Sequence, residues 1–196
     1  MAPFGVGWGK AGDFPPPPAV SRRAGWPPRR QGWCVDQAFY QGYALNAVDA
    51  KNRLSVPVDF RAVVQARSGT SEILVGPGFG DVTCLMAYDR SHVARLMAGF
   101  ESRNGATMDR AAYDEAEFLF GTAKSLTIDD AGRIVLPPAL QDLGGITKHV
   151  WFIAGFHWFE MWDPWDYLAR PDLHPAKRKI LLSELRQKGL TEERPA

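Results

Sequence analysis

Short runs of alternating apolar and polar residues, separated by turn residues, dominate the chain from about Phe39 onward. A period of two indicates a half-buried strand, and apolar residues three and four apart indicate a helix. The predicted strands are residues 43–48, 53–56, 73–75, 84–88, 123–128, 133–136, 150–153 and 158–162. The predicted helices are residues 58–64, 90–100, 109–120, 138–143, 164–169 and 175–187, the last with Ile180, Leu181 and Leu185 inward. The pattern predicts a mainly β protein with short helices, of the α+β class, ending in a C-terminal helix.

The order strand, turn, strand, short helix, strand, strand, helix occurs twice. Residues 46–64 (NAVDAKNRLSVPVDFRAVV) align with residues 126–144 (LTIDDAGRIVLPPALQDLG) at an offset of 80. Five apolar positions match in register and three residues are identical. The identical pairs are Asp49 with Asp129, Arg53 with Arg133, and Pro57 with Pro137. We therefore predict two copies of one β-unit, because self-similarity at a fixed offset is the signature of a duplicated element.

An Asp-x-x-x-Arg turn joins the first two strands of each copy. Aspartate favours turn starts because its side chain accepts backbone N–H bonds. A residue with positive φ is expected before each arginine; glycine adopts it freely and asparagine is the common substitute. Proline then ends each second strand and begins the short helix. The residues predicted to have structural roles are Asp49, Pro57, Asp129, Gly132 and Pro137.

The arginine after the first turn is the main candidate for DNA binding. A guanidinium at a hairpin tip can reach phosphates or a guanine edge with two donors at once. The alternative is that Arg53 pairs with Asp49 and only stabilises the turn. Lys51 is predicted to contact phosphate. Asn52 is predicted to shape the turn, with a base contact as the alternative.

The second turn is less basic, since Asp130 and Ala131 replace Ala50 and Lys51. Arg133 is a candidate DNA contact, with a salt bridge to Asp129 or Asp130 as the alternative. Arg61, on the short helix after the first turn, is a further candidate that could flank the DNA. We expect the first copy to meet DNA and the second mainly to build subunit contacts.

These segments resemble the MraZ family. The first half of the resemblance rests on residues 43–57 (YALNAVDAKNRLSVP) and the Asp59-Phe60-Arg61 that follows. The second half rests on residues 126–137 (LTIDDAGRIVLP), 145–148 (GITK) and 156–162 (FHWFEMW). Together they extend over about 39–169, two-thirds of the chain. The sequence departs from the family at Asn52, where glycine is usual, and in the extra residues 1–38.

The resemblance implies a fold, an activity and an assembly. The fold is two tandem SpoVT-AbrB-type units that pair into a swapped-hairpin barrel. The activity is binding of double-stranded DNA at short direct repeats upstream of the division and cell-wall gene cluster, usually as a repressor. The assembly is a ring of identical subunits. The predicted organisation is a disordered extension (1–38), unit 1 (41–90), a helical connector (91–120), unit 2 (121–166) and a C-terminal helical tail (167–196).

Charge limits how such a protein can hold DNA. The net charge is +1 over 196 residues, but residues 1–40 and 170–196 each carry +3 and residues 41–169 carry −5. The middle of the chain therefore cannot rely on bulk positive charge. It needs a few cations gathered on one face, and several copies of that face. A ring-shaped scaffold that binds proteins without sequence-specific DNA binding is the alternative function.

Aromatic residues gather in the second copy. We predict that they form the core and a subunit interface, because large aromatics dominate both. Stacking on single-stranded bases is the alternative. The residues concerned are Trp151, Phe152, Phe156, Trp158, Phe159, Trp162 and Trp165.

Catalysis and metal binding find little support in the sequence. The histidines are scattered and match no metal-ligand spacing, so neither a metal, a cofactor nor an enzyme is predicted. Cys84 with His92 is the remaining enzyme alternative. Residues 76–80 (GPGFG) lack the lysine of a phosphate-binding loop and are predicted to be a bend. Cys34 and Cys84 are predicted free thiols. No apolar run suits a membrane helix and no signal peptide is evident, which predicts a cytoplasmic protein. The DNA binding that the resemblance implies would associate it with the nucleoid.

Overall fold

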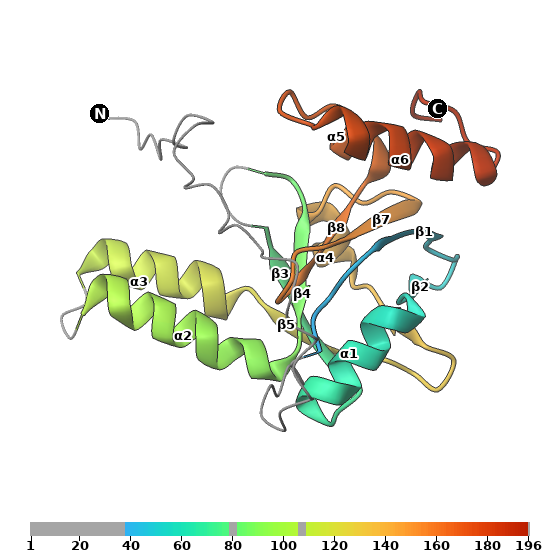
Figure 1. The fold of residues 1–196 in the computed structure, drawn as a ribbon. Coiled ribbons are helices and arrows are strands. Elements are labelled where there is room, and N and C mark those ends of the chain that lie inside the picture. The colour runs from blue at the N-terminus through green and yellow to red at the C-terminus, as the bar shows by residue number, and fades with distance from the viewer. Residues whose placement is uncertain (1–37, 79–81, 106–108, 196) are drawn as a thin grey trace, which may run out of the picture. The chain divides into compact units, whose positions relative to one another are not determined.

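Two antiparallel sheets organise the chain in the computed structural model, which describes residues 38–78, 82–105 and 109–195 (Figure 1). A six-stranded sheet has the order β1-β7-β8-β4-β3-β5, and β2 and β6 form a separate ribbon. The strands are β1 (Tyr43–Ala47), β2 (Arg53–Ser55), β3 (Glu72–Pro77), β4 (Leu85–Tyr88), β5 (Lys124–Thr127), β6 (Arg133–Val135), β7 (His149–Ala154) and β8 (Phe159–Trp162). The α+β class is confirmed.

Helices connect and cover these strands. They are α1 (Val58–Ser68), α2 (Arg90–Asn104), α3 (Arg110–Ala116), α4 (Pro138–Leu143), α5 (Pro164–Leu168) and α6 (Pro175–Gln187), with a π-helical turn η1 (Glu117–Gly121) after α3. Helix α1 is longer than predicted because it continues to a left-handed Gly69 at its C-terminus. The single helix predicted over residues 109–120 is in fact α3 followed by η1.

Strand pairing interleaves the two predicted copies. Strand β1 pairs with β7, β3 with β5, and β4 with β8, so three of the sheet's ladders join one copy to the other. The ribbon is a fourth such ladder, with Leu54 opposite Ile134. Exchanging each strand for its counterpart, β1 for β5, β3 for β7 and β4 for β8, gives the same order read from the other edge of the sheet. The two copies are therefore related by an internal pseudo-two-fold arrangement.

A closed barrel, which the resemblance implied, is wrong for this chain. Strands β1 and β5 lie at opposite edges of the large sheet and do not pair with each other. The turns after β1 and β5 carry the chain out of the sheet into the three-residue strands β2 and β6, which pair only with each other. The result is an open sheet with the ribbon against one face. Side chains from the ribbon and the sheet pack together between them and form the core.

The main core lies between that face and the ribbon. Leu54 and Ile134 are fully buried there, and Phe60 of α1 and Leu140 of α4 pack into the same cluster. Phe152 joins them from the sheet. Burial of each such side chain contributes roughly 1.5–3 kcal/mol. The short helices that follow the turns thus serve to cover the ribbon's flanks.

The opposite face of the sheet is covered from the C-terminal side. Helix α6 lies over this face (Figure 1), and its Leu181 and Leu185 pack with Leu45 and Trp151 of the sheet. The prediction that Ile180 also faces inward is wrong: it is 37% exposed. Leu181 and Leu185 lie four residues apart on one stripe of the helix, and Ile180 falls beside that stripe.

The aromatic cluster of the second copy is mostly core, as predicted. Five of its members are buried, whereas Phe156 is 57% exposed at the turn between β7 and β8. Phe156 also has a positive φ of 71°, an uncommon conformation for a bulky residue. The buried members are Trp151, Phe152, Phe159, Trp162 and Trp165.

Several predictions concern residues outside the described ranges. The disordered extension falls almost wholly on residues 1–37, and Cys34 lies among them. Phe79 and Gly80 of the predicted bend also lie outside. Cys84 is a free, buried cysteine. Within the described ranges, no helix has the length and apolar character needed to cross a membrane.

Buried carboxylates fix the start of one helix in each copy. Asp89 is fully buried, caps α2 by accepting from the Ser91 N–H (2.9 Å), accepts from the Tyr40 hydroxyl (3.0 Å) and pairs with Arg67 (3.2 Å). Asp163 is equally buried and caps α5. It accepts from the Thr147 hydroxyl (3.1 Å), and Arg194 of the C-terminal segment supplies its cation (2.9 Å).

Asp89→Asn should strongly destabilise the protein. The substitution leaves the Arg67 guanidinium, which is 9% exposed, without its anion, and breaking a buried pair costs about 3–5 kcal/mol. Urea unfolding measures the loss. Asp114→Asn is the matched control, because its pair with Arg110 is exposed and worth less than about 1 kcal/mol. Equal losses in both variants would contradict this account of Asp89.

Candidate nucleic-acid interface

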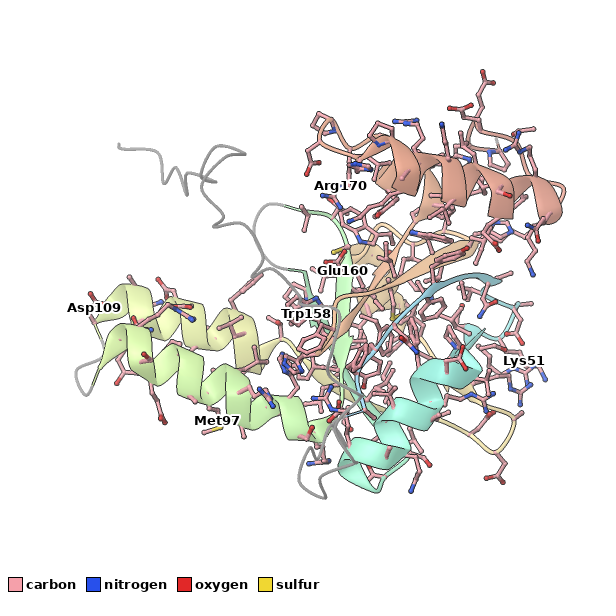
Figure 2. The ribbon with its side chains drawn as sticks, in the orientation of Figure 1. Lys51, Met97, Asp109, Trp158, Glu160 and Arg170 are labelled. Atoms are coloured by element: carbon pink, nitrogen blue, oxygen red, sulfur yellow. The ribbon has the colours of Figure 1, made fainter. Side chains whose placement is uncertain are left out.

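The first turn is held by its aspartate. Asp49 Oδ1 accepts from the N–H of Lys51 (2.8 Å) and the N–H of Arg53 (2.9 Å). Asp49 Oδ2 accepts from Arg53 Nε (2.7 Å) and lies 2.7 Å from Arg53 Nη2. These bonds to Arg53 lower the pKa of Asp49 to about 2. Lys51 extends from the tip of this turn (Figure 2).

The second turn has the same geometry. Asp129 Oδ1 accepts from the Arg133 N–H (2.8 Å), and Oδ2 accepts from Nε (3.0 Å) and Nη2 (2.9 Å). The hydrogen bonds from Arg133 lower the pKa of Asp129, and Asp129 raises the pKa of Arg133. The structural pairing considered for each arginine is therefore present, and the partner of Arg133 is Asp129, not Asp130. One Nη group of each arginine remains outside these bonds.

Both arginines lie on one face of the ribbon. Because Leu54 and Ile134 point into the core, their neighbours along each strand point to solvent. Arg53 is opposite Val135, so Arg133 is its diagonal neighbour, at roughly 7–8 Å between Cα atoms. Each side chain is 33% exposed. The two turns also hold each other: Val56 N–H donates to the Gly132 carbonyl and Leu136 N–H to the Asn52 carbonyl. The ribbon thus unites two motifs that are 80 residues apart.

The position of Arg61 explains why the residue before the arginine is asparagine in the first turn and glycine in the second. Its guanidinium lies against Gly132, where a Cβ would overlap it. The equivalent residue of the second copy is Gln141, which instead donates to the Leu136 carbonyl (2.8 Å). Asn52 has φ 58° and Gly132 has φ 77°, so both turns need a left-handed residue. The second turn needs glycine also for space, which no local sequence signal revealed.

Gly132→Ala should cost more than the left-handed backbone alone. That backbone costs about 1–2 kcal/mol for a residue with a Cβ, and displacement of the Arg61 guanidinium adds to it. In an Arg61→Ala background the cost should fall to the backbone part. Unfolding free energies of the double-mutant cycle measure the coupling, expected at about 0.5 kcal/mol or more. Additive losses would contradict the contact, and Asn52→Gly, which introduces no Cβ, serves as the near-neutral control.

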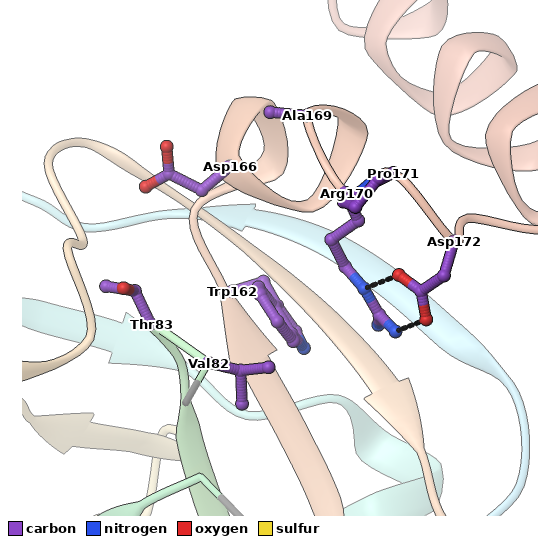
Figure 3. Close-up of a pocket in the computed structure, with 8 residues that line it drawn as sticks. All are labelled: Val82, Thr83, Trp162, Asp166, Ala169, Arg170, Pro171 and Asp172. Atoms are coloured by element: carbon purple, nitrogen blue, oxygen red, sulfur yellow. Dashed lines mark hydrogen bonds and ion pairs between the residues drawn. The ribbon is translucent and has the colours of Figure 1, made fainter. Parts of the chain in front are cut away.

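An open cavity of about 470 Å³ lies beside Trp162 and Arg170 (Figure 3). The Arg170 Cζ lies 5.1 Å from the centroid of the Trp162 ring, and Arg170 Nε and Nη2 donate to the two carboxylate oxygens of Asp172 (3.3 and 2.9 Å). Its charge is therefore already neutralised. The lining residues are Val82, Thr83, Trp162, Asp166, Ala169, Arg170, Pro171 and Asp172, which include neither a histidine nor a cysteine.

The chemistry of Cys84 and His92 argues against the reactive pair considered as the enzyme alternative. Burial raises the pKa of the Cys84 thiol to about 12, which disfavours the nucleophilic thiolate. His92 is 4% exposed and stacks on His157 with ring centroids 5.9 Å apart. Burial, with the nearby His157 and Arg67, lowers the pKa of His92 to about 4. Across the described ranges, no three metal-ligating side chains form a cluster.

Mild acid should destabilise the protein through His92. The folded chain holds this imidazole neutral, whereas the unfolded chain protonates it below its usual pKa of 6.5. Stability is therefore complete above pH 6.5 and decreases as the pH falls towards 4. Between about pH 7.5 and pH 5, His92 should account for about 2 kcal/mol of the loss. Urea unfolding of His92→Leu should show a correspondingly smaller loss; equal pH dependence in the two proteins would disprove this.

Known proteins share these segments. The family model described as "MraZ protein, putative antitoxin-like" matches residues 119–170. The transcriptional regulator MraZ of Rickettsia bellii (strain OSU 85-389) is 33% identical over 147 residues, which are 74% of this chain and 95% of the relative. The protein of the same name from Rickettsia akari (strain Hartford) is 30% identical over 123 residues, 63% of this chain and 80% of the relative. The chain belongs to the MraZ family.

Family membership agrees with the resemblance predicted from the two turn motifs. The segment matched by the MraZ model contains the second turn, with Asp129 and Arg133, and the aromatic strands that follow. The DNA-contacting roles of Lys51, Asn52, Arg53, Arg61 and Arg133 stay predictions. Arg53 and Arg133 share one face of the ribbon, Lys51 and Asn52 lie in the turn before Arg53, and Arg61 lies on α1.

Proposed function

We propose that this chain is a DNA-binding transcriptional regulator and that the solvent face of the β2–β6 ribbon is its DNA-contacting surface. The observation that supports this most directly is the placement of Arg53 and Arg133 as diagonal neighbours on that face. Lys51 is exposed at the adjoining turn. The printed name of the Rickettsia relatives, transcriptional regulator, agrees with this function.

Each arginine would bind DNA with its geometry set in advance. The carboxylate of Asp49 orients the Arg53 fork, and Asp129 does the same for Arg133. A pre-oriented guanidinium loses less side-chain entropy when it meets a phosphate or a guanine edge. Asn52 and Gly132 then serve to shape the turns. Arg61, against Gly132, lies beside the second turn and would flank the DNA there.

The finer part of the proposal follows from the family resemblance. We propose tandem SpoVT-AbrB-type units, a ring-shaped homo-oligomer, and recognition of short direct repeats upstream of the division and cell-wall gene cluster, with repression as the outcome and the nucleoid as the place of action. The −5 charge of residues 41–169 supports a multivalent assembly, because one protomer offers few cations to a polyanion. Exposed Met97, Tyr113 and Phe118 offer apolar area for contacts between protomers.

Arg53→Ala and Arg133→Ala should each weaken DNA binding. A bidentate contact is worth about 1–3 kcal/mol, so affinity should fall roughly 10-fold or more for each variant, and further for the double variant. Gel shift on the duplex upstream of the chain's own gene measures the loss. Arg110→Ala removes an exposed arginine of α3 and is the matched control. No shift by the wild type would overturn the proposal.

Asp49→Asn separates a binding role of Arg53 from a structural one. It removes the carboxylate that holds the guanidinium but leaves the arginine in place. If Arg53 binds DNA, Asp49→Asn should retain most of the affinity that Arg53→Ala loses. Equal losses in the two variants would mean that the pair only stabilises the turn. A ring-shaped scaffold without sequence-specific binding would instead shift promoter and scrambled duplexes alike.

A further inference from the structure

The solvent face of the β2–β6 ribbon carries four side chains, and one of them is apolar. Leu54 and Ile134 point into the core, so the residues on either side of them in each strand point to solvent. These residues are Arg53, Ser55, Arg133 and Val135. The Val135 side chain is 58% exposed. An apolar group therefore lies within the surface proposed to meet DNA.

The register pairs Val135 directly with Arg53 across the ribbon. Directly opposite residues of two antiparallel strands share a face, and their Cβ atoms are about 4.5–5.5 Å apart. Ser55 is paired in the same way with Arg133. Each arginine thus has one short neighbour on the opposite strand. The neighbour is a valine at the first arginine and a serine at the second.

These two neighbours break the internal symmetry of the ribbon. The offset of 80 that relates Arg53 to Arg133 also relates Ser55 to Val135. A ribbon with the same residue at both neighbour positions would present the same face after rotation by half a turn about the pseudo-two-fold axis. Because one position is serine and the other is valine, the two ends of the face differ in chemistry. The ribbon therefore has a direction.

The major groove of B-DNA offers a valine one kind of partner. The groove admits a two-stranded β-ribbon, and the base edges in it present hydrogen-bonding groups and the 5-methyl group of thymine. A valine has no donor or acceptor, so the thymine methyl is the group that it contacts favourably. A serine hydroxyl both donates and accepts, so it bonds to more than one base. The valine end of the ribbon is thus suited to select thymine, and the serine end is not.

We propose that Val135 is a specificity-determining residue that contacts the 5-methyl group of a thymine in the major groove, next to the contact made by Arg53. This inference rests on the proposed function of the ribbon. Because a valine is short, the contact requires the ribbon itself to enter the groove. Base pairs are stacked about 3.4 Å apart, so the thymine lies within about two base pairs of the Arg53 contact. Each protomer would then read DNA in one direction, as recognition of direct repeats needs.

Replacement of thymine by deoxyuridine tests the contact, because it removes the methyl group and leaves base pairing intact. Fluorescence anisotropy would be measured on the duplex upstream of the chain's own gene, with each thymine replaced in turn. At the thymine that Val135 contacts, the affinity of the wild type should fall about 3–5-fold, the effect of one buried methyl group. Val135→Ala should bind the unmodified duplex more weakly by a similar factor and should be insensitive to that replacement. Val135→Ile should remain sensitive to it.

Val82→Ala is the matched control, since Val82 is also exposed (40%) but lies with Trp162 and Arg170 at the open cavity. It should match the wild type on every duplex. Because the readout is the ratio of two affinities measured on one protein, a partly unfolded fraction of Val135→Ala cancels.

Two results would overturn the role of Val135 while leaving the proposed function in place. One is a wild type that binds all the deoxyuridine duplexes as tightly as the unmodified one. The other is a Val135→Ala protein that keeps the full sensitivity to deoxyuridine; a smaller assembly in light scattering would then assign Val135 to a contact between protomers. Failure of the wild type to bind the unmodified duplex would overturn both the role of Val135 and the proposed function.

Discussion

The three-residue ladder between β2 and β6 is the constraint on which the rest of the arrangement depends. It directs the side chains of Leu54 and Ile134 towards the large sheet and leaves those of Arg53 and Arg133 on the opposite, solvent-exposed side. Strands this short gain little from their own hydrogen bonds, since an isolated two-stranded ribbon is marginal in water. Their stability comes from the core that they cover. The candidate binding face and the hydrophobic core are therefore two sides of one element.

The internal pseudo-symmetry extends to the buried polar groups. Each copy has a buried aspartate that caps a helix, but the two aspartates pair with cations from different parts of the chain. Asp89 and Asp163 are both fully buried helix caps. The first obtains its cation from Arg67 of α1, whereas the second obtains it from Arg194 near the C-terminus. A buried carboxylate without a partner is costly, so each copy has to recruit a cation from some part of the chain.

Turn chemistry and alternating patterns were sufficient to predict most elements and the motif residues. The left-handed positions, the Asp-to-Arg bonding and the proline-started helices follow from interactions within five residues, which sequence reveals directly. The ends of α1 and of the helix expected over 109–120 were less well predicted. Ile180 was misplaced because its exposure depends on how α6 lies against the sheet, and a helical pattern alone does not determine that.

The sequence by itself determined the α+β class, the two Asp-x-x-x-Arg turns and the membership in a family of regulators. The tertiary structure alone decided that both arginines share one face and that Arg61 belongs beside Gly132. It also decided that the sheet stays open. The physical reason is that strand pairing between copies acts over about 50–110 residues, and no local pattern encodes which distant strand becomes the neighbour.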